Sequence, residues 1–337
     1  MPSWALNSNK YERTRSRGTG PIRTLAPLCV AIVNYNGWQD TLECLSSLSL
    51  STYQDFSPIV IDNASRDNSV QMIRGAFQDV EVIRSEANLG YSGGCNLALR
   101  RALVGGAAYC LVLNNDLVLD PDALKFLVST ATAHPEAAGI GPAIMDYYDK
   151  DVVLSLGGRV NLRTGWSEHV GRGLSGAGIA TIPIDVVDYI DGCALMFNLR
   201  KLDSIGTMNE RLFMYFEDTD WCYRAKRLGF SLIVEPKARV WHKVGRSVNR
   251  ENVKITYWFH RNRVAFEKIH ASSYEWICFW AGFAWNTLVV PQLRRNKNSS
   301  RGQRKVRALL PVAKSLGRGL LDGLYGASIY EEEYKVG

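Results

Sequence analysis

Three short segments of the sequence place carboxylate and imidazole side chains where they could do chemistry. Asp116 ends the tripeptide Asn114-Asn115-Asp116, which follows the apolar run 109–113. A carboxylate at the end of a strand is a hard oxygen ligand that suits Mg²⁺ or Mn²⁺, and such an ion neutralises the phosphates of a diphosphate. The same tripeptide also suits an Asx turn that caps the next helix, so by itself it does not decide the function.

The second and third segments supply more acids and one histidine. Glu217, Asp218 and Asp220 open the stretch 217–227, whose pattern predicts a helix. Carboxylates at a helix start raise one another's pKa, which suits a general base; complementation of the helix dipole is the alternative interpretation. His242 follows the short run 238–241. A lone histidine is more often packed than a ligand, so its assignment depends on the other segments.

These residues need a scaffold, and residues 28–144 predict one. Short β-rich runs alternate there with helix-length segments, which is typical of βαβ units and a mostly parallel sheet. Such sheets bind ligands at the carboxyl ends of their strands, where this sequence has polar junctions at 34–37, 62–65 and 114–116. The expected strands are 28–33, 59–62, 80–83, 109–113 and 138–144, and the expected helices are 38–48, 67–77, 93–104 and 121–133.

The pattern is weaker after residue 144. Residues 145–185 are glycine-rich and predict irregular structure or short antiparallel hairpins. Residues 186–197 predict an apolar strand interrupted by Asp191-Gly192, and the runs 230–234 and 238–241 predict two more short strands. Asp120-Pro121 predicts the N-cap and first residue of the fourth helix.

Charge and hydropathy predict a protein that binds to a membrane surface. The net charge is +7, and residues 291–320 hold nine bases and no acid. The body of the chain is mildly acidic, which argues against a nucleic-acid binder, and the basic segment predicts an anionic membrane surface as partner. A merely solvated basic tail is the alternative.

The most apolar window, 274–290, contains three tryptophans and an uninterrupted apolar part of 15 residues. This is short for a span of about 20 residues, so we expect an interfacial or re-entrant helix. A packed helix, or the interface of a homo-oligomer, is the alternative. Seven scattered cysteines without a CxxC pair predict reduced core thiols and a cytosolic-side location.

In order along the chain, six stretches resemble the family 2 glycosyltransferases, which have the GT-A fold. Closest in pattern are bacterial rhamnosyltransferase-like members that act on lipid-linked acceptors. The resemblance covers about residues 28–245. The stretches are 33–36, 61–67, 88–94, 113–116, 191–194 and 216–220, followed by Arg224 and the pair Trp241-His242.

The resemblance implies a role for each matching residue. Asp116 and His242 would bind Mg²⁺ or Mn²⁺; the family's motif is usually Asp-x-Asp, and Asn114 stands at its first position, so Asp116 is the main ligand. Asp218 would deprotonate the acceptor hydroxyl, with Glu217 and Asp220 shaping its charge and position. The residues implied in binding the nucleotide-sugar donor are Val33, Asn34, Tyr35, Asp62, Asn63, Asn88, Gly90, Gly93, Asn115 and Asp191, with Gly93 and Gly94 opening a helix.

The implied protein is an inverting, metal-dependent glycosyltransferase with an α/β GT-A fold. Its expected parts are a basic flexible tail (1–26), a catalytic domain (27–250) and a helical extension (251–337) that associates with a membrane or oligomerises. The favoured donor is dTDP-L-rhamnose; UDP-galactofuranose, UDP-galactose and UDP-glucose stay open. The acceptor would be a polyprenyl-diphosphate-linked sugar or another glycan of the cell envelope, reached from the cytoplasmic face of the membrane.

Two other classes are weighed against this one. A catalytically silent nucleotide-sugar-binding subunit would not need Asp116, Asp218 and His242 together. A nucleotidyltransferase is expected to carry a glycine-rich loop with a basic residue after the first strand, and residues 34–37 hold no base. A dehydrogenase is disfavoured because 88–94 lacks the G-x-G-x-x-G spacing.

Overall fold

The computed structural model describes residues 24–183, 185–244, 253–284 and 317–324. The chain forms two compact units. Of the described residues, the sheet unit contains those up to Gly158, then His169–Phe213 and Glu217–Lys243. The helical unit contains Arg159–Glu168, Met214–Phe216 and the described residues from Val244 onward. The expected boundary at residue 250 and most of the expected tail 1–26 lie outside the described residues.

The elements of the chain alternate as expected in its first half. In order they are β1 (Leu28–Asn34), α1 (Trp38–Ser49), β2 (Phe56–Asp62), α2 (Ser69–Ala76), β3 (Glu81–Arg84), α3 (Gly90–Val104), β4 (Tyr109–Asn114), β5 (Leu117–Leu119), α4 (Ala123–Ala133) and β6 (Gly139–Asp146). They continue with β7 (Val153–Ser155), β8 (Gly158–Asn161), β9 (Trp166–His169), β10 (Asp185–Val186), β11 (Ala194–Asn198), α5 (Leu202–Ile205), α6 (Glu217–Arg227), β12 (Leu232–His242), α7 (Val253–His270) and α8 (Ser273–Ala284).

The sheet unit is built on one mixed sheet with the order β10-β12-β6-β11-β4-β1-β2-β3. Strands β1 to β4 run parallel to one another, and β6 runs parallel to β12. Strand β11 lies between β4 and β6 and is antiparallel to both. In the register, Asn34 lies opposite Asp62, and Val33 lies opposite Asn114. The polar junctions after β1, β2 and β4 therefore meet at one edge of the sheet, as the sequence predicts.

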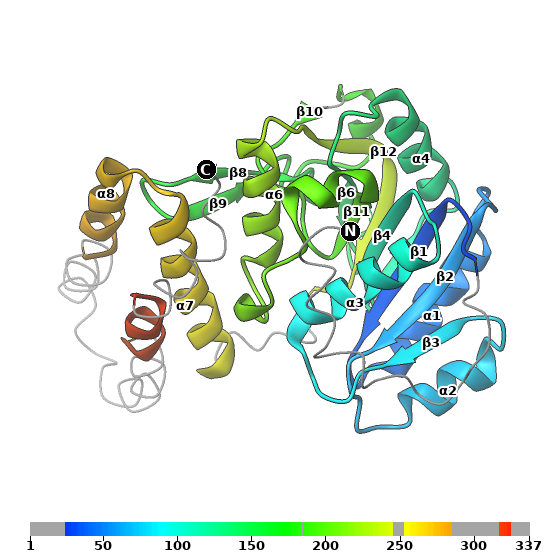
Figure 1. Ribbon diagram of the computed structural model, residues 1–337. Coiled ribbons are helices and arrows are strands. Elements are labelled where there is room, and N and C mark those ends of the chain that lie inside the picture. Colours follow the sequence, from blue (N-terminus) through cyan, green and yellow to red (C-terminus); the bar gives the residue numbers. More distant parts are fainter. Residues whose placement is uncertain (1–23, 184, 245–252, 285–316, 325–337) are drawn as a thin grey trace, which may run out of the picture. The chain divides into compact units, whose positions relative to one another are not determined.

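Helices cover both faces of this sheet (Figure 1). Every residue of β1 is buried, as expected of a central strand covered on both sides. Alternate residues point to opposite faces: Val30 and Ile32 join the core beneath α1, α2 and α4. On the other face α3 packs on β1, β2 and β4, and Trp221 of α6 packs edge-on against Phe197 of β11, with 4.6 Å between ring centroids.

Four local expectations need correction. α4 begins at Ala123 with Asp122 as N-cap, and the Asp120 carboxylate instead accepts the Asp122 N–H at 2.9 Å. α3 begins at Gly90, three residues before the expected start. The break expected at Asp191-Gly192 is wider than predicted, because β10 ends at Val186 and β11 begins only at Ala194. The two runs at 230–234 and 238–241 form one strand, β12, with an irregularity between Glu235 and Arg239.

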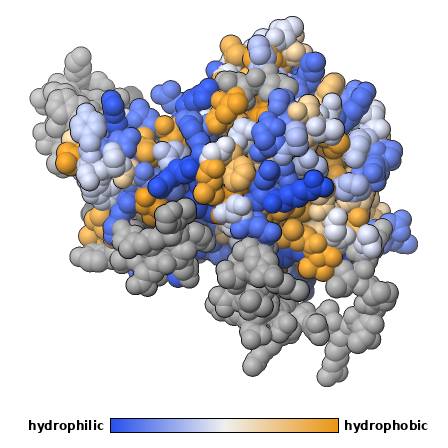
Figure 2. Space-filling view, turned by 45° about the horizontal axis from the view of Figure 1, so that its top comes forward, coloured by the Kyte–Doolittle hydropathy of each residue, from blue (hydrophilic) through white to orange (hydrophobic). Residues whose placement is uncertain are grey.

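The helical unit packs aromatic side chains around α7. Phe259 of α7 lies near the rings of Trp166, Tyr215 and Phe216, and Arg263 donates its Nε–H to the Gly165 carbonyl at 2.8 Å. On the face shown in Figure 2, hydrophobic and hydrophilic side chains of the described residues are interspersed in small patches. No helix within the described ranges is both long enough and apolar enough to cross a membrane.

Candidate active site

Asp116 and His242 meet at the carboxyl ends of β4 and β12. The antiparallel pairing of β12 with β5 sets His242 opposite Leu117, and the Lys243 N–H donates to the Asp116 carbonyl at 3.1 Å. The His242 Nε2 lies 3.2 Å from Asp116 Oδ1. Sheet topology thus joins an acid and a histidine that are far apart in the sequence.

Lys243 fixes this strand end against α1. Its Nζ donates to Asp40 Oδ1 at 2.6 Å and to Glu43 Oε2 at 2.5 Å. The Tyr147 hydroxyl donates to the other Glu43 oxygen at 2.7 Å. The side chain of Lys243 is only 7 % exposed. A buried, fully paired ammonium next to His242 holds the end of the strand in place.

The pair Asp116–His242 fits a divalent cation held with few protein ligands. Asp116 Oδ1 is buried and accepts no hydrogen bond from the described residues. Those residues contain no cluster of three or more His, Cys, Asp or Glu side chains that could hold a metal. One carboxylate with one imidazole is the kind of incomplete ligand set that Mg²⁺ or Mn²⁺ completes with water and substrate phosphates.

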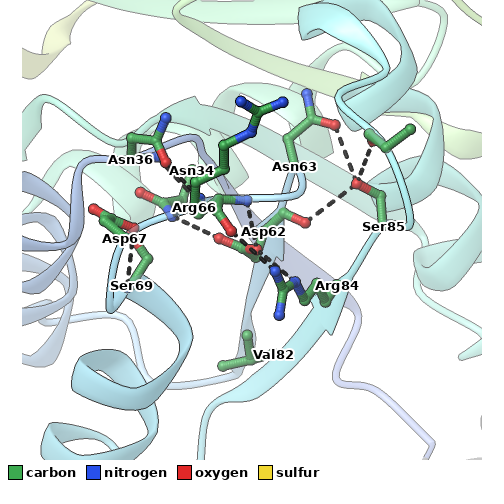
Figure 3. A network of polar contacts seen from close by, with 12 residues as sticks. Asn34, Asn36, Asp62, Asn63, Arg66, Asp67, Ser69, Val82, Arg84 and Ser85 are labelled. Carbon is green, nitrogen blue, oxygen red and sulfur yellow. Dashed lines mark hydrogen bonds and ion pairs between the residues drawn. The ribbon is translucent and has the colours of Figure 1, made fainter.

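A second group of predicted residues lies after β1 and β2 (Figure 3). The Asn34 amide donates to Asp62 Oδ1 at 2.9 Å and to Ser65 Oγ at 3.1 Å. Arg84 crosses from β3, with its Nε 3.6 Å from Asp62 Oδ2 and its Nη2 donating to the Ser65 carbonyl at 2.9 Å. Asp62 is fully buried, and its charge is met by these donors. Asn115 joins the group by donating to the Gly37 carbonyl at 2.9 Å.

A cavity of about 630 Å³ opens beside this group. Tyr35 lines it and is 45 % exposed, so its ring is available to a ligand. Ala64, in the turn below, has a φ of 61°, a conformation that is uncommon without glycine and that clusters at binding sites. The lining residues are Tyr35, Ala64, Ser65, Arg66, Asp67, Arg84, Glu86, Ala87 and Asn88.

Asn63 connects the β2 junction to the start of α3. Its Nδ2 donates to the Gly90 carbonyl at 2.8 Å and to Asn88 Oδ1 at 3.2 Å. Gly90 has a φ of +72°, and a Cβ there would lie 2.3 Å from the Phe213 carbonyl. Only glycine fits at that position. In α3, a Cβ on Gly94 would lie 2.8 Å from Val33, and one on Gly93 would lie 2.4 Å from the neighbouring Leu89 side chain.

The acids of α6 differ in their surroundings. Asp218 Oδ2 accepts the Gly192 N–H at 2.8 Å, and its Oδ1 accepts the N–H of Thr219 at 2.6 Å. Burial raises the pKa of Asp218, and these hydrogen bonds oppose the rise. Glu217 is 5 % exposed, and burial, followed by the charge of Asp218, raises its pKa well above the usual value. Glu217 therefore holds its proton more firmly than an exposed glutamate.

Asp220 faces a different partner. Its Oδ2 lies 3.0 Å from the Nε of Arg224, one helical turn later, and both side chains are buried. Arg224 also donates to the carbonyls of Ile205 and Thr207. Arg224 thus ties α6 to residues 205–207, and Asp220 orients the Arg224 side chain that makes this connection.

Asp191 lies beside a histidine that the sequence analysis did not single out. His169 Nδ1 is 3.2 Å from Asp191 Oδ1, and Ser155 Oγ donates to Asp191 Oδ2 at 2.5 Å. The Tyr189 hydroxyl is 3.2 Å from the same ring nitrogen. The hydrogen bond with Asp191 raises the pKa of His169. His169 stands in the irregular stretch 145–185, where no periodicity or motif marks it.

Cys193 feels the charge of three of the predicted carboxylates. Burial raises the pKa of its thiol well above the usual value, and the charges of Asp191, Asp116 and Asp218 raise it further. The Cys193 carbonyl accepts the Asn114 N–H at 2.8 Å. Asp116, Asp191 and Asp218 therefore all act electrostatically on one thiol.

Comparison with known sequences identifies the family. The model of the family "Glycosyl transferase family 2" matches residues 29–199. A similar curated protein is the N-acetylglucosaminyl-diphospho-decaprenol L-rhamnosyltransferase of Mycobacterium tuberculosis, 26 % identical over 71 % of this chain and 83 % of that protein. Another is the low-salt glycan biosynthesis hexosyltransferase Agl10 of Haloferax volcanii, 29 % identical over 60 % of this chain and 62 % of that protein.

Solved structures support the fold. GalNAc-T7, determined with UDP, GalNAc and Mn²⁺, superposes with a TM-score of 0.60 at 14 % identity; 93 % of this chain is covered, and the chain spans 58 % of that protein. The mannosyltransferase PcManGT of Pyrobaculum calidifontis, with GDP-Man and Mn²⁺, gives 0.54 at 15 % identity over 98 % of this chain and 94 % of that one. The fold is therefore GT-A, and because the family model covers half of the sequence, the chain belongs to glycosyl transferase family 2, as a glycosyltransferase with rhamnosyltransferase-like relatives.

Proposed function

We propose that the protein is an inverting, divalent-metal-dependent glycosyltransferase that moves a sugar from a nucleoside diphosphate donor to a hydroxyl of a lipid-linked acceptor. The observation that carries this proposal is the 3.2 Å approach of Asp116 and His242 in a family 2 fold. The charges of Asp116, Asp191 and Asp218 all raise the pKa of the Cys193 thiol, which supports the proposal that these acids act in one site. Displacement at a sugar carbon needs positive charge at the leaving diphosphate and a base for the acceptor hydroxyl.

Asp116 and His242 would hold the cation, which we take to be Mg²⁺ or Mn²⁺. When bound, the ion supplies positive charge to the diphosphate that leaves. Asp116 Oδ1, buried and without a hydrogen-bond donor in the described residues, is an oxygen that such an ion satisfies. Two of the structural neighbours were determined with Mn²⁺, which supports this assignment.

Asp218 is proposed as the general base. The Gly192 and Thr219 N–H groups orient its carboxylate, and burial raises its pKa, which makes it a better proton acceptor than an exposed aspartate. The acceptor oxygen loses its proton to Asp218 and attacks the sugar carbon from the side opposite the leaving diphosphate. Burial and the charge of Asp218 raise the pKa of Glu217 well above its usual value, so Glu217 carries a negative charge beside the base less readily than an exposed glutamate.

The donor is proposed to be dTDP-L-rhamnose, and the acceptor a polyprenyl-diphosphate-linked sugar. Support comes from the mycobacterial relative, whose name specifies rhamnose transfer to a decaprenyl-diphosphate-linked sugar. The cavity lined by Tyr35, Arg66 and Arg84 would take the nucleoside end of the donor, with Asn34, Asp62 and Asn63 behind it. UDP-sugars are the competing donors.

The enzyme is further proposed to bind the cytoplasmic membrane surface peripherally. On α8, Tyr274 is 62 % and Ile277 67 % exposed, which suits a helix that rests an apolar face on lipid. Residues 291–320 hold nine bases, of which only Arg318 lies within the described residues, and these bases would add attraction to anionic headgroups. Sedimentation with anionic vesicles that is lost in high salt supports this; no sedimentation at low salt overturns it and leaves α8 as a candidate oligomer contact.

The function is tested with a panel of nucleotide sugars, each incubated with the protein, a polyprenyl-diphosphate-linked N-acetylglucosamine, and Mg²⁺ or Mn²⁺. Nucleoside diphosphate release from dTDP-L-rhamnose that EDTA abolishes is the expected result. Release from a UDP-sugar instead corrects the donor only. If no donor reacts but calorimetry shows one bound, the chain is a silent binding subunit and the proposal is wrong.

The base assignment has its own test. Asp218→Asn keeps the size, and its amide oxygen can still accept the Gly192 N–H, but the side chain cannot accept the acceptor proton, so we expect kcat to fall at least about 100-fold. The thermal unfolding temperature serves as the control for folding. An Asp218→Asn protein that is folded and turns over at the wild-type rate would falsify the assignment.

A further inference from the structure

The backbone just before the proposed base is held in an unusual conformation. Phe213, Tyr215 and Phe216 have φ values of 65°, 71° and 68°. Residues with a bulky side chain are rarely found in the left-handed region, because their Cβ collides with the following carbonyl oxygen. Three such residues within four positions form a strained turn, and such strain persists only where the surroundings over-determine it.

One side chain of α7 holds this turn. Asn262 is fully buried, and its single amino group donates to the carbonyls of Met214 and Tyr215, both at 2.8 Å. The Asn262 carbonyl oxygen in turn accepts from Arg261 Nε at 2.8 Å, so the orientation of the amide is fixed. Two donors aimed at consecutive carbonyls specify the direction of both peptide planes, which is what a left-handed turn requires.

Aromatic packing from the same helix closes the turn. The Phe216 ring lies 5.4 Å from that of Phe259 and 5.7 Å from that of Phe266, both on α7. The Tyr215 ring is 6.0 Å from Phe259. The turn Met214–Phe216 therefore belongs to the helical unit by its contacts, although its next residues along the chain, Glu217 and Asp218, begin the helix that carries the proposed base.

We propose that Asn262 is a positioning residue for the transfer reaction: by fixing the strained turn 213–216 it sets the place of Asp218 at the start of α6. The inference rests on the proposed function, since it takes Asp218 as the base. It assigns a part in catalysis to α7, which lies beyond the residues that the family model matches. Loss of the clamp lets the turn relax toward ordinary φ values, which moves the N-terminus of α6 and the carboxylate with it.

The test compares Asn262→Asp with Tyr257→Phe. Asn262→Asp keeps the shape but replaces the amino group by an oxygen that opposes the two carbonyls. Tyr257→Phe removes a different α7 hydrogen bond, to Asp322 at 2.6 Å, away from the turn. We expect kcat of Asn262→Asp to fall about 10- to 100-fold, as a displacement of about 1 Å causes, with the donor dissociation constant unchanged. The Tyr257→Phe enzyme should keep its kcat.

A rescue separates positioning from simple packing. Glycine adopts positive φ without the steric cost, so adding Tyr215→Gly to Asn262→Asp should restore part of the lost kcat, although it removes a packed ring. If Asn262→Asp fails to fold, Asn262→Ser, which keeps one short donor, takes its place with the same expectation. Equal kcat for the Asn262 variant and the Tyr257→Phe control, or donor affinity that falls in parallel with kcat, overturns the inference.

Asp218→Asn, assayed beside these variants, distinguishes a failure of the positioning role of Asn262 from a failure of the base assignment. If Asp218→Asn is inactive while the folded Asn262 variant keeps its kcat, the positioning role is wrong and the base assignment stands. If Asp218→Asn keeps its turnover, the proposed base fails first, and a loss of kcat in Asn262→Asp cannot then be assigned to Asp218.

Discussion

At the scale of single residues, Asp116 is the side chain whose surroundings most resemble an incomplete metal site. Its Oδ1 accepts no hydrogen bond from the described residues and lies 3.2 Å from His242 Nε2, so Asp116→Asn chiefly removes the negative charge that a cation would meet. We expect Mn²⁺ binding to weaken at least about tenfold, the loss that even an outer partner of a metal site causes. Isothermal titration calorimetry with Mn²⁺ measures this loss. The unfolding temperature of the variant, which should be close to that of the wild type, is the control for folding.

The matched control for that titration is Asp203→Asn, which removes one negative charge from an exposed position on α5. It should leave Mn²⁺ affinity unchanged. If both substitutions weaken binding equally, the effect is one of overall charge, and Asp116 is not a ligand.

Gly192 offers a second residue-scale prediction, because its N–H holds Asp218. A Cβ at residue 192 would lie 2.9 Å from Asp218 Oδ2, the atom that accepts this N–H. Gly192→Ala should displace the carboxylate and lower kcat by about 10- to 100-fold. Gly75→Ala in α2, where a Cβ meets nothing within 4 Å, should keep full activity and stabilise the protein by about 0.5–1 kcal/mol. Steady-state kinetics and urea unfolding measure the two effects; loss of activity in both variants contradicts the argument.

Residue chemistry explains which site residues could be found from sequence. Asp116 and Asp218 follow a strand or open a helix in a recognisable order, and the register of β1, β2 and β4 brings the junctions together as predicted. His169 carries no such signal, since its partner Asp191 is reached only through the fold of a glycine-rich stretch. Asn262 was missed because an asparagine inside a helix has no pattern that reveals the carbonyls it meets. The assignment of the site residues to donor, metal and base stays a prediction.

At the scale of elements, sequence patterns locate strands better than their ends. Pro236 interrupts the apolar pattern of β12 because proline has no N–H for the ladder, so one strand was predicted as two. In the structure the strand continues through this point, and its pairing register with β6 shifts between Glu235 and Arg239. At α3 the helix was expected to open at Gly93-Gly94, yet Gly90, with its φ of +72°, is the residue that makes the turn. Both errors come from tertiary contacts that local patterns do not contain.

Helix α7 carries a buried acid that makes stability depend on pH. Glu267 is fully buried, and neither of its carboxylate oxygens has a hydrogen-bond donor among the described residues. Burial raises its pKa from 4.5 to about 8, opposed by the charge of Arg263. The folded state therefore binds the proton more tightly than the unfolded state. The stability from this group is fully present below about pH 4.5 and is lost as the pH rises through 8.

Glu267→Gln keeps the shape and abolishes this titration. The unfolding temperature of the variant should be close to that of the wild type at pH 5 and exceed it by an increasing margin up to pH 9. Differential scanning calorimetry across that range measures the margin. A difference that does not change with pH contradicts the buried, neutral state of Glu267.

At the scale of the whole molecule, the two units are not two separate lengths of chain. The chain passes between them five times, at residues 158/159, 168/169, 213/214, 216/217 and 243/244. Two of the segments in the helical unit come from inside the sheet unit's sequence, and α7 holds both: Arg263 bonds the Gly165 carbonyl, and Asn262 bonds the turn at Met214. Neither segment keeps its hydrogen-bond partner if α7 unfolds.

This connectivity predicts one thermal transition. Unfolding of the helical unit releases the turn that leads into α6 and the segment that leads into His169, so the sheet unit loses its constraints at the same time. Calorimetry should give equal calorimetric and van't Hoff enthalpies, and dTDP-L-rhamnose with Mn²⁺, which we expect to bind the sheet unit, should shift the whole transition upward. Two resolved transitions, with only one shifted by the ligands, would mean that the helical unit unfolds independently. In that case the hold of α7 on the turn 213–216 is too weak to place the catalytic carboxylate.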